Sequence, residues 1–494
     1  MRWELDWLEN RARLSPHKNA VIDEKTSKAW TFEQLNKRAN STASWLYTRG
    51  VKKGDRVALL SPNDISYFDF MFACGKIGAI FVPLNWRLSL HEINEILADC
   101  TPIVIVIHQE FETICQQLNN LSTFLIEEAS NYEAQVSYVI SEEILETDPL
   151  AMIYTGGTTG KPKGVVLSHQ SILWNAMNTI LSWGLAEDDV TVNYMPMFHT
   201  GGLNALSIPL LMMGGTVVIG KSFVGKEAVE TLNRFNCTTI LLVPTMYHSL
   251  IQTAEFQNSD FPCMKIFLSG AAPCPMQIYE AFQKKGLAFK EGYGLTEAGP
   301  NNFYISPVDA QINRGSVGKP MLFNTIKLVK TDGCETEPNE VGELLIKGKH
   351  AFSFYWNQEQ ETKETVKDGW IHTGDLAKRD EQGFYYIVGR KKEMIITGGE
   401  NVYPLEIEQW LAAHPAIDEA AVLGLPDEKW GEVVAAFITF KHTYSIQDEE
   451  LRTYCQSKLG RYKIPKQFIR LEELPKTHVG KIDKEKLKEM KIQS

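Results

Sequence analysis

Residues Thr155 to Gly164 contain only glycine, threonine, lysine and proline, so this stretch has nothing to bury. Glycines let backbone N–H groups turn toward an anion, threonine hydroxyls donate, and lysines supply positive charge. The stretch is not the P-loop of GTPases, because Gly156 and Gly160 bracket only three residues and Pro162 follows Lys161. We expect a nucleotide phosphate loop, with an ordinary surface turn as the alternative. Its candidate ligands are Thr155, Gly156, Gly157, Thr158, Thr159, Gly160, Lys161 and Lys163.

Length and composition indicate a multidomain cytoplasmic protein. A chain of 494 residues exceeds what one hydrophobic core usually supports. The 50 lysines and arginines against 61 acids give a net charge of −11, which argues against nucleic acid as a partner. The eight cysteines are scattered without metal-site spacing, and we expect buried thiols in a reducing compartment. Neither a signal peptide nor a run of about 18 apolar residues occurs, so we expect no integral membrane segment.

Alternating strand and helix patterns predict an α/β fold with parallel sheets flanked by helices. Strands are expected at residues 56–60, 80–82, 103–107, 216–219, 239–243 and 265–268, and helices at residues 65–77 and 92–98. After about residue 310 the pattern changes to hairpins, at residues 326–329, 342–346 and 384–388. The last part, with helices at 405–413 and 448–459 and strands at 420–423 and 435–440, predicts a small α+β domain.

Tyr154 to Gly164 resemble the phosphate loop of the adenylate-forming superfamily, whose pattern is Tyr-Thr-Ser-Gly-Thr-Thr-Gly-x-Pro-Lys-Gly. Gly156 stands where that family has serine, so one hydroxyl donor is missing. Further family motifs follow in the family's order, at 293–297, 369–375, 389–393, 398–404 and 475–481. The chain therefore resembles an AMP-dependent acyl-CoA synthetase over nearly its whole length, most like fatty-acid and o-succinylbenzoate ligases.

The resemblance implies that ATP, magnesium and coenzyme A are used. It assigns three catalytic residues, Lys481, Thr296 and His199, and one magnesium ligand, Glu297. Lys481 reaches the carboxylate and the phosphate, with plain solvation of a terminal lysine as the alternative. Thr296 bonds the α-phosphate, and Glu297 holds magnesium. His199 matches the aromatic gate between the ATP and acyl sites, with a core histidine as the alternative.

The resemblance also assigns the nucleoside and coenzyme A contacts. Asp375 and Arg390 bind the ribose, because a carboxylate accepts from both hydroxyls, although an isolated turn aspartate would look the same. Tyr293 lies against adenine, with a buried core tyrosine as the alternative. The remaining binding residues are Gly270, Ala271, Ala272 and Gly294 around the nucleotide, and Gly398, Gly399 and Glu400 on the thioester-forming face.

The family pattern implies two domains and a pivot. Residues 1–389 form the AMP-binding N-terminal domain with its β-rich subdomain, 390–392 the hinge, and 393–494 a small mobile C-terminal domain. A homodimer is one option for the assembly. Because two half-reactions share one pocket, the small domain is expected to turn between them.

The acid substrate is the least constrained part of the prediction. No acidic residue follows Phe198, which argues for a plain carboxylic acid over an amino acid. We expect the acyl pocket at residues 195–206, 243–248 and 298–303, where Met195, Met197, Met246, Leu203 and Phe303 suit a hydrocarbon tail. A medium- to long-chain fatty acid is therefore favoured. The alternatives are o-succinylbenzoate or another aryl acid, for which Asn204, Asn301 and Asn302 offer polar groups, and a stand-alone enzyme that loads a carrier protein.

Overall fold

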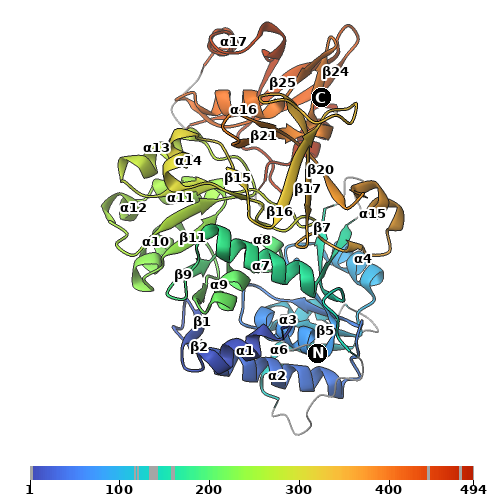
Figure 1. The fold of residues 1–494 in the computed structure, drawn as a ribbon. Coiled ribbons are helices and arrows are strands. Elements are labelled where there is room, and N and C mark those ends of the chain that lie inside the picture. Colours follow the sequence, from blue (N-terminus) through green and yellow to red (C-terminus); the bar gives the residue numbers. More distant parts are fainter. Residues whose placement is uncertain are drawn as a thin grey trace.

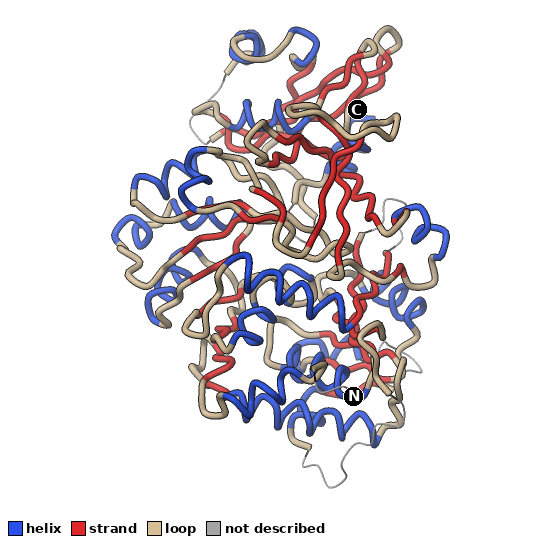
Figure 2. The backbone as a smooth tube through the Cα atoms, in the orientation of Figure 1, coloured by secondary structure: helices blue, strands red, loops and turns tan. Residues whose placement is uncertain are grey.

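A computed structural model of the chain describes residues 4–115, 118, 122–132, 143–156, 162–441, 446–477 and 481–492. Its α/β fold, with large parallel sheets, a β-rich part and a small C-terminal part, confirms the predicted fold class. The C-terminal part, coloured orange to red, lies at the end of the molecule opposite the N-terminus (Figure 1). The strands of the β-rich part lie between that end and the rest of the chain (Figure 2).

The first sheet has seven strands, parallel except at its β1–β2 edge. In sheet order they are β13 (Phe289–Glu291), β12 (Ile266–Ser269), β11 (Thr239–Leu242), β9 (Val190–Asn193), β10 (Thr216–Ile219), β1 (Asn19–Asp23) and β2 (Ala29–Thr31). The parallel strands that end at Leu242, Ser269 and Glu291 direct the loops after them toward one edge of the sheet, where binding residues gather in open parallel sheets.

The second sheet also has seven strands, parallel in its middle and antiparallel at one end. The order is β18 (Phe354–Tyr355), β8 (Lys163–Ser168), β7 (Pro149–Thr155), β4 (Ile80–Leu84), β3 (Arg56–Leu60), β5 (Val104–Ile107) and β6 (Thr123–Leu125). β7 and β8 are the two sides of the predicted phosphate loop, with Thr155 opposite Lys163.

Helices pack around the sheets, and α3 (Ser66–Ile77) is buried on all sides. In α3 every residue is buried, and the helix ends at Gly78 in a left-handed conformation. Two charged side chains of α3 are buried as ion pairs, Asp69 with Arg38 and Lys76 with Asp6. Other helices around the sheets include α2 (Phe32–Thr48), α4 (Leu90–Cys100) and α7 (His169–Trp183).

The third sheet is antiparallel and corresponds to the predicted hairpins. Its strands are β16 (Asn324–Val329), β17 (Val341–Gly348), β20 (Trp370–Arg379) and β19 (Val366–Lys367), with β21 (Tyr385–Arg390) on the free side of β20. β21 leads directly into the C-terminal part through the short 3-10 helix η2 (Lys391–Glu393).

The fourth sheet forms the core of the C-terminal part, with α16 (Pro404–Ala412), α17 (Asp448–Gln456) and α18 (Lys484–Ile492) around it. Its order is β23 (Glu400–Val402), β22 (Ile395–Thr397), β25 (Gly431–Phe440) and β24 (Ile417–Asp427), with β26 (Gln467–Arg470) beside β25. The β24–β25 hairpin is longer than predicted, because continuous pairing from Ala420 to Asp427 carries even Pro426 into a strand.

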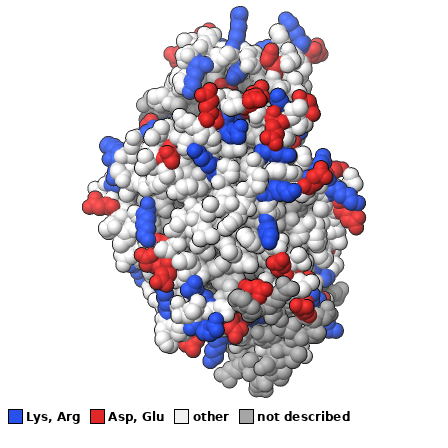
Figure 3. Space-filling view, viewed as in Figure 1, with Lys and Arg blue, Asp and Glu red and all other residues white. Residues whose placement is uncertain are grey.

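The prediction of buried cysteines was wrong for two of them. Cys263 is exposed in the turn between α12 (Ala254–Asn258) and β12, Cys334 is exposed in the polar turn between β16 and β17, and no disulfide joins the described cysteines. No helix among the described residues is long and apolar enough to cross a membrane. On the face in Figure 3 basic and acidic side chains intermingle, without a large patch of either sign.

Candidate active site

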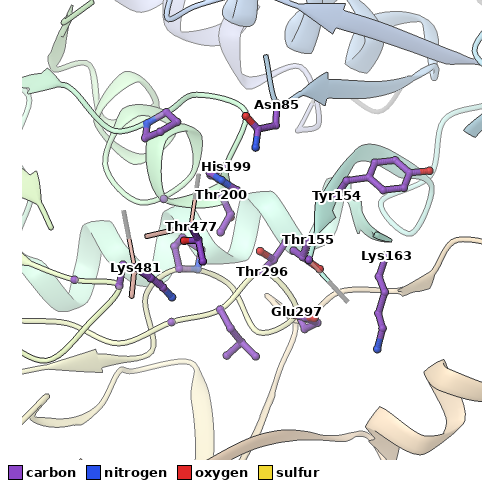
Figure 4. A pocket seen from close by; sticks show the side chains of 18 of the residues that line it. Asn85, Tyr154, Thr155, Lys163, His199, Thr200, Thr296, Glu297, Thr477 and Lys481 are labelled. Carbon is purple, nitrogen blue, oxygen red and sulfur yellow. The ribbon is translucent and has the colours of Figure 1, made fainter. Parts of the chain in front are cut away.

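A cavity of about 1240 Å³ lies between the two large sheets and the C-terminal part. Its lining brings together segments that are far apart in the sequence. The lining includes Thr155, Gly156, Lys163, His199, Gly270, Ala271, Gly294, Thr296, Glu297, Gly374, Arg390 and Lys481. Most of the predicted site residues that are described therefore share one cavity (Figure 4).

The described ends of the predicted phosphate loop line this cavity. Thr155 closes β7, Gly156 follows it, and Lys163 opens β8. Gly157, Thr158, Thr159, Gly160 and Lys161 lie outside the described residues.

Lys163 is already engaged by an acid. Its ammonium forms an ion pair with Glu361 of α15 (Glu359–Thr365), and its Nζ lies 5.3 Å from the centre of the Tyr355 ring. Glu361 and Glu364 also line the cavity, so a phosphate that binds Lys163 must compete with a carboxylate.

Thr296 and Glu297 follow β13 in a tight loop. A Cβ on Gly294 would lie 2.1 Å from the carbonyl carbon of Pro300, so only glycine allows this close approach. The Tyr355 hydroxyl donates to Glu297 Oε1 at 2.8 Å, and the Phe352 N–H donates to the Glu297 carbonyl at 2.7 Å. These contacts fix the Glu297 carboxylate at the cavity wall.

His199 immediately precedes the short helix α8 (Thr200–Leu203), and its ring centre lies 4.6 Å from that of Phe198. Burial lowers the pKa of His199 to about 4, with further lowering by the charges of Lys481 and Arg87. Its Nε2 is buried and has no hydrogen-bond partner in the described part of the chain. The imidazole is therefore neutral at pH 7 and retains an unused polar atom.

Lys481 enters the cavity from the C-terminal part. Its carbonyl accepts from the Thr477 N–H at 2.7 Å, and Lys476 and Ile482 form an antiparallel bridge around it. Burial lowers the pKa of Lys481, the Arg390 charge lowers it further, and Asp375 and Glu393 oppose this. Lys481 and Thr477 lie near Thr200 and His199 in Figure 4, so the two parts of the chain contribute to one site.

Asp375 and Arg390 face each other on β20 and β21. Arg390 Nε lies 2.7 Å from Asp375 Oδ1, and the Tyr293 hydroxyl donates to Asp375 Oδ2. Burial raises the pKa of Asp375 despite the opposing charge of Arg390. Tyr293 packs edge-on against Phe303 at 5.9 Å and is not part of the cavity lining. Its predicted contact with adenine stays a prediction.

The other predicted binding residues divide into two groups. Gly270 and Ala271 line the cavity, whereas Ala272 is exposed beside it. Gly398 and Gly399 form the turn between β22 and β23, Glu400 is the first residue of β23, and all three lie outside the lining. The conformation that brings Lys481 into the cavity therefore leaves that turn away from it.

The acyl end of the cavity differs from the prediction. Met195, Thr200, Gly201, Val243 and Asn301 line it as expected. Met197, Leu203 and Phe303 do not, because their side chains are at most 1% exposed and belong to the hydrophobic core. Met246 packs against a second core cluster. Most of the adaptable apolar side chains expected around the acid are thus structural.

The three asparagines are largely occupied by internal hydrogen bonds. Asn301 Nδ2 donates to Thr179 Oγ1 at 2.9 Å and to the Ala205 carbonyl at 2.8 Å. Asn302 Nδ2 donates to the Gly299 carbonyl, and its Oδ1 contacts His350 Nε2. Asn204 Nδ2 donates to Thr200 Oγ1. These amides fix the loops of the site, and only Asn301 reaches the lining.

Sequence reasoning missed Trp183 and Glu361, which both line the cavity. Trp183 is the last residue of α7, and its Nε1–H donates to the Phe303 carbonyl at 3.2 Å. No motif marks either residue. A tryptophan just before the helix-ending Gly184 was the only sequence signal, and it is equally typical of a core side chain.

Two protein-family models match most of the chain. The AMP-binding enzyme model matches residues 8–356, and the model of the AMP-binding enzyme C-terminal domain matches residues 406–481. The feruloyl-CoA synthase of Amycolatopsis sp is 35% identical over 476 residues, 96% of each chain. The 2-succinylbenzoate–CoA ligase of Bacillus cereus (strain Q1) is 35% identical over 487 residues, 98% of each chain.

Solved structures agree with this similarity. The o-succinylbenzoate CoA synthetase of Bacillus subtilis, in complex with its acyl-adenylate intermediate, has a TM-score of 0.90 at 32% identity, with 98% of each chain covered. The same synthetase with ATP and magnesium gives a TM-score of 0.88 at 32% identity, covering 97% of this chain and 98% of that one. A fatty acyl CoA synthetase of Mycobacterium tuberculosis gives 0.80 at 32% identity, with 98% of each chain covered.

Proposed function

This chain belongs to the AMP-binding enzyme family and is an AMP-forming acid–CoA ligase, and on that premise we propose that it activates an aryl carboxylic acid. In the first half-reaction a carboxylate oxygen attacks the α-phosphorus of ATP and pyrophosphate leaves. In the second, the thiol of coenzyme A attacks the acyl carbon and AMP leaves. The proposal concerns the acid, of the 2-succinylbenzoate or hydroxycinnamate type.

The observation that carries this choice is the acyl end of the cavity. The fatty-acid reading depended on a lining of methionine, leucine and phenylalanine, but Met197, Leu203 and Phe303 are core residues. The lining contains Trp183, Gly201 and Gly292, an indole and two positions without side chains, beside the aliphatic side chains of Met195, Leu241, Val243 and Leu268. Such a slot suits a flat ring better than a flexible chain. The feruloyl and 2-succinylbenzoate relatives favour the same alternative, and a fatty-acid substrate is not confirmed.

We expect the enzyme to release AMP faster with ring acids than with chain acids. Ferulate, 2-succinylbenzoate, octanoate and palmitate are compared in a coupled AMP-release assay with coenzyme A, and a ring acid should give the highest kcat/KM. A higher kcat/KM for either fatty acid would overturn the aryl assignment. AMP release that needs a carrier protein, with free coenzyme A left unconsumed, would instead identify a carrier-loading enzyme.

For the activation step, we assign the charge-stabilising role to Lys481, the α-phosphate contact to Thr296 and the gate to His199. Carboxylate and triphosphate repel each other, so the barrier is mainly electrostatic. The lowered pKa of Lys481 and its proximity to Asp375 support a charge donor held inside the cavity. The unpartnered Nε2 of His199 supports a polar contact with the bound acid or adenylate.

Glu297 fits the role of a magnesium ligand. Magnesium is commonly held by one or two carboxylates together with substrate phosphates, and Glu297 is a cavity carboxylate positioned by Tyr355. When bound, magnesium neutralises charge on the phosphate oxygens. No cluster of three or more acidic, histidine or cysteine ligands occurs among the described residues.

Gly156 gives a direct test of the phosphate loop. A Cβ at Gly156 would meet no atom of the described residues within 4 Å, so Gly156→Ser should leave the fold intact. The added hydroxyl should tighten ATP binding by one hydrogen bond, about 0.5 to 1.5 kcal/mol. Isothermal titration with ATP measures the effect, and Gly156→Ala, which adds a methyl without a hydroxyl, is the control. A serine variant that binds ATP no better than the alanine variant would contradict the loop assignment.

For the domain organisation we retain residues 1–389, 390–392 and 393–494 as large domain, hinge and small domain. The fourth sheet begins at Ile395, directly after η2, which supports a joint at this point. In the described conformation Lys481 occupies the cavity and the Gly398–Glu400 turn does not, which supports the adenylate-forming arrangement. A homodimer stays a prediction.

A further inference from the structure

Lys290 is a buried lysine on the cavity side of the first sheet. In the register of β11, β12 and β13, Leu241 pairs with Leu268 and Leu268 pairs with Lys290. Paired residues of neighbouring strands point to the same face. Leu241 and Leu268 both line the cavity, so Lys290 continues their row at the edge strand.

The Lys290 ammonium lies against two aromatic rings. Its Nζ is 4.7 Å from the ring centre of Trp183, which lines the cavity, and 4.5 Å from that of Tyr304. The space beside the indole is kept open by Gly292, whose Cβ position lies 4.0 Å from the Trp183 Cζ2. The Trp183 ring therefore lies between this cation and the cavity.

Lys290 has no acidic partner among the described residues. The side chain is 4% exposed, and it takes part in no ion pair within that part of the chain. The neighbouring Glu291 points to the other face, where it accepts from the Tyr279 hydroxyl at 2.7 Å and from the Cys274 N–H at 2.9 Å. Burial alone lowers the pKa of Lys290 to about 7.

The charged form of Lys290 is destabilised in this position relative to water. Burying a charge costs several kcal/mol, whereas each cation–π contact returns about 0.5 to 2 kcal/mol. The flexible four-carbon stem lets the ammonium shift from the ring face toward the ring edge. An acceptor oxygen delivered through the cavity would supply the missing partner.

We propose that Lys290 determines acid specificity by binding an acceptor oxygen at the end of the acid remote from the carboxylate that is activated. The reacting end lies near His199 and Lys481, which both line the cavity, and the Lys481 charge lowers the pKa of His199. The substrate class is thus a ring acid with a distal oxygen, either a phenol or a second carboxylate. A methyl-terminated chain would leave the ammonium unpaired. This inference rests on the proposed function and refines its substrate.

Matched acids test the proposal. We compare 4-hydroxycinnamate with cinnamate, and 2-succinylbenzoate with 4-oxo-4-phenylbutanoate, which lacks the ring carboxylate. Lys290→Met should lower kcat/KM for an oxygenated acid about 10- to 100-fold, the loss expected for one hydrogen bond to a charged group, mainly through KM. The unoxygenated partner should change less than about 3-fold, because it never used the ammonium. Lys290→Arg should restore part of the preference, and Lys284→Met, an exposed lysine of neighbouring α13 (Met276–Lys284), is the control.

The outcomes distinguish failure of the proposed Lys290 role from failure of the aryl-acid assignment. A selective loss in the phenol pair or in the carboxylate pair supports the proposal and identifies which oxygen is bound. Equal losses within both pairs, or no loss in either, overturn the role of Lys290 while leaving the aryl assignment intact. If the unaltered enzyme activates none of the four acids, the aryl assignment itself fails. Should Lys290→Met not fold, Lys290→Gln serves the same comparison.

Discussion

Replacing Lys481 with alanine is expected to slow acyl-adenylate formation by roughly 100- to 1,000-fold, the usual loss when one donor to a transition-state charge is removed. Lys481 is the lysine that the C-terminal part brings toward His199 and Asp375, and its pKa is lowered by burial and by Arg390. Its ammonium is thus held close to the place where negative charge must accumulate. Acid-dependent exchange of pyrophosphate into ATP measures this step alone.

Thioester formation from supplied acyl-adenylate should survive the Lys481→Ala substitution, because no phosphoryl transfer is left to catalyse. Lys488→Ala, an exposed lysine of α18 outside the cavity lining, is the matched control and should leave both half-reactions unchanged. Equal losses in the two half-reactions would show that Lys481 supports the structure of the site instead of the chemistry.

Replacing Lys392 with proline should separate the two half-reactions. Lys392 lies in the 3-10 helix η2, whose typical φ of about −50° to −70° matches the roughly −65° that proline imposes. Proline is therefore compatible with the described conformation, in which Lys481 lines the cavity, and it opposes rotation away from it. We expect acid-dependent pyrophosphate exchange to persist while acyl-CoA formation collapses.

Lys392→Ala distinguishes the backbone effect from loss of the side chain, because alanine keeps φ free. Both activities of the alanine variant should stay close to normal. A proline variant that forms acyl-CoA at the normal rate would rule out a hinge at Lys392 and, with it, the two-conformation mechanism for this chain.

Local patterns predicted the elements of this fold well. The strands at 56–60 and 216–219 and the helix at 65–77 coincide with β3, β10 and α3 within one residue, because each is a short apolar unit between clear turn residues. The hairpin of the small domain was underestimated, because Pro426 and Asp427 pair only in the context of a partner strand.

The candidate site was predictable where chemistry and spacing coincide, as in the loop at Gly156 and the segment at Thr296. The acyl end was not. Met195 lines the cavity and Met197 does not, a difference in side-chain direction that no composition rule contains. The position of Lys290 depends on the register of three strands whose paired residues Leu241, Leu268 and Lys290 are each more than twenty positions apart, which only the folded sheet defines.

The ion pair between Arg390 and Asp375 links the proposed nucleotide contact to the proposed joint between the domains. Asp375 is the proposed ribose contact, and Arg390 is the first residue of the proposed joint between the domains. A nucleotide that draws the Asp375 carboxylate away from the Arg390 guanidinium weakens the ion pair that holds that joint. By reciprocity, any orientation of the small domain that alters this ion pair must change nucleotide affinity by the same factor. In the proposed mechanism, departure of AMP and rotation of the small domain are thus thermodynamically coupled.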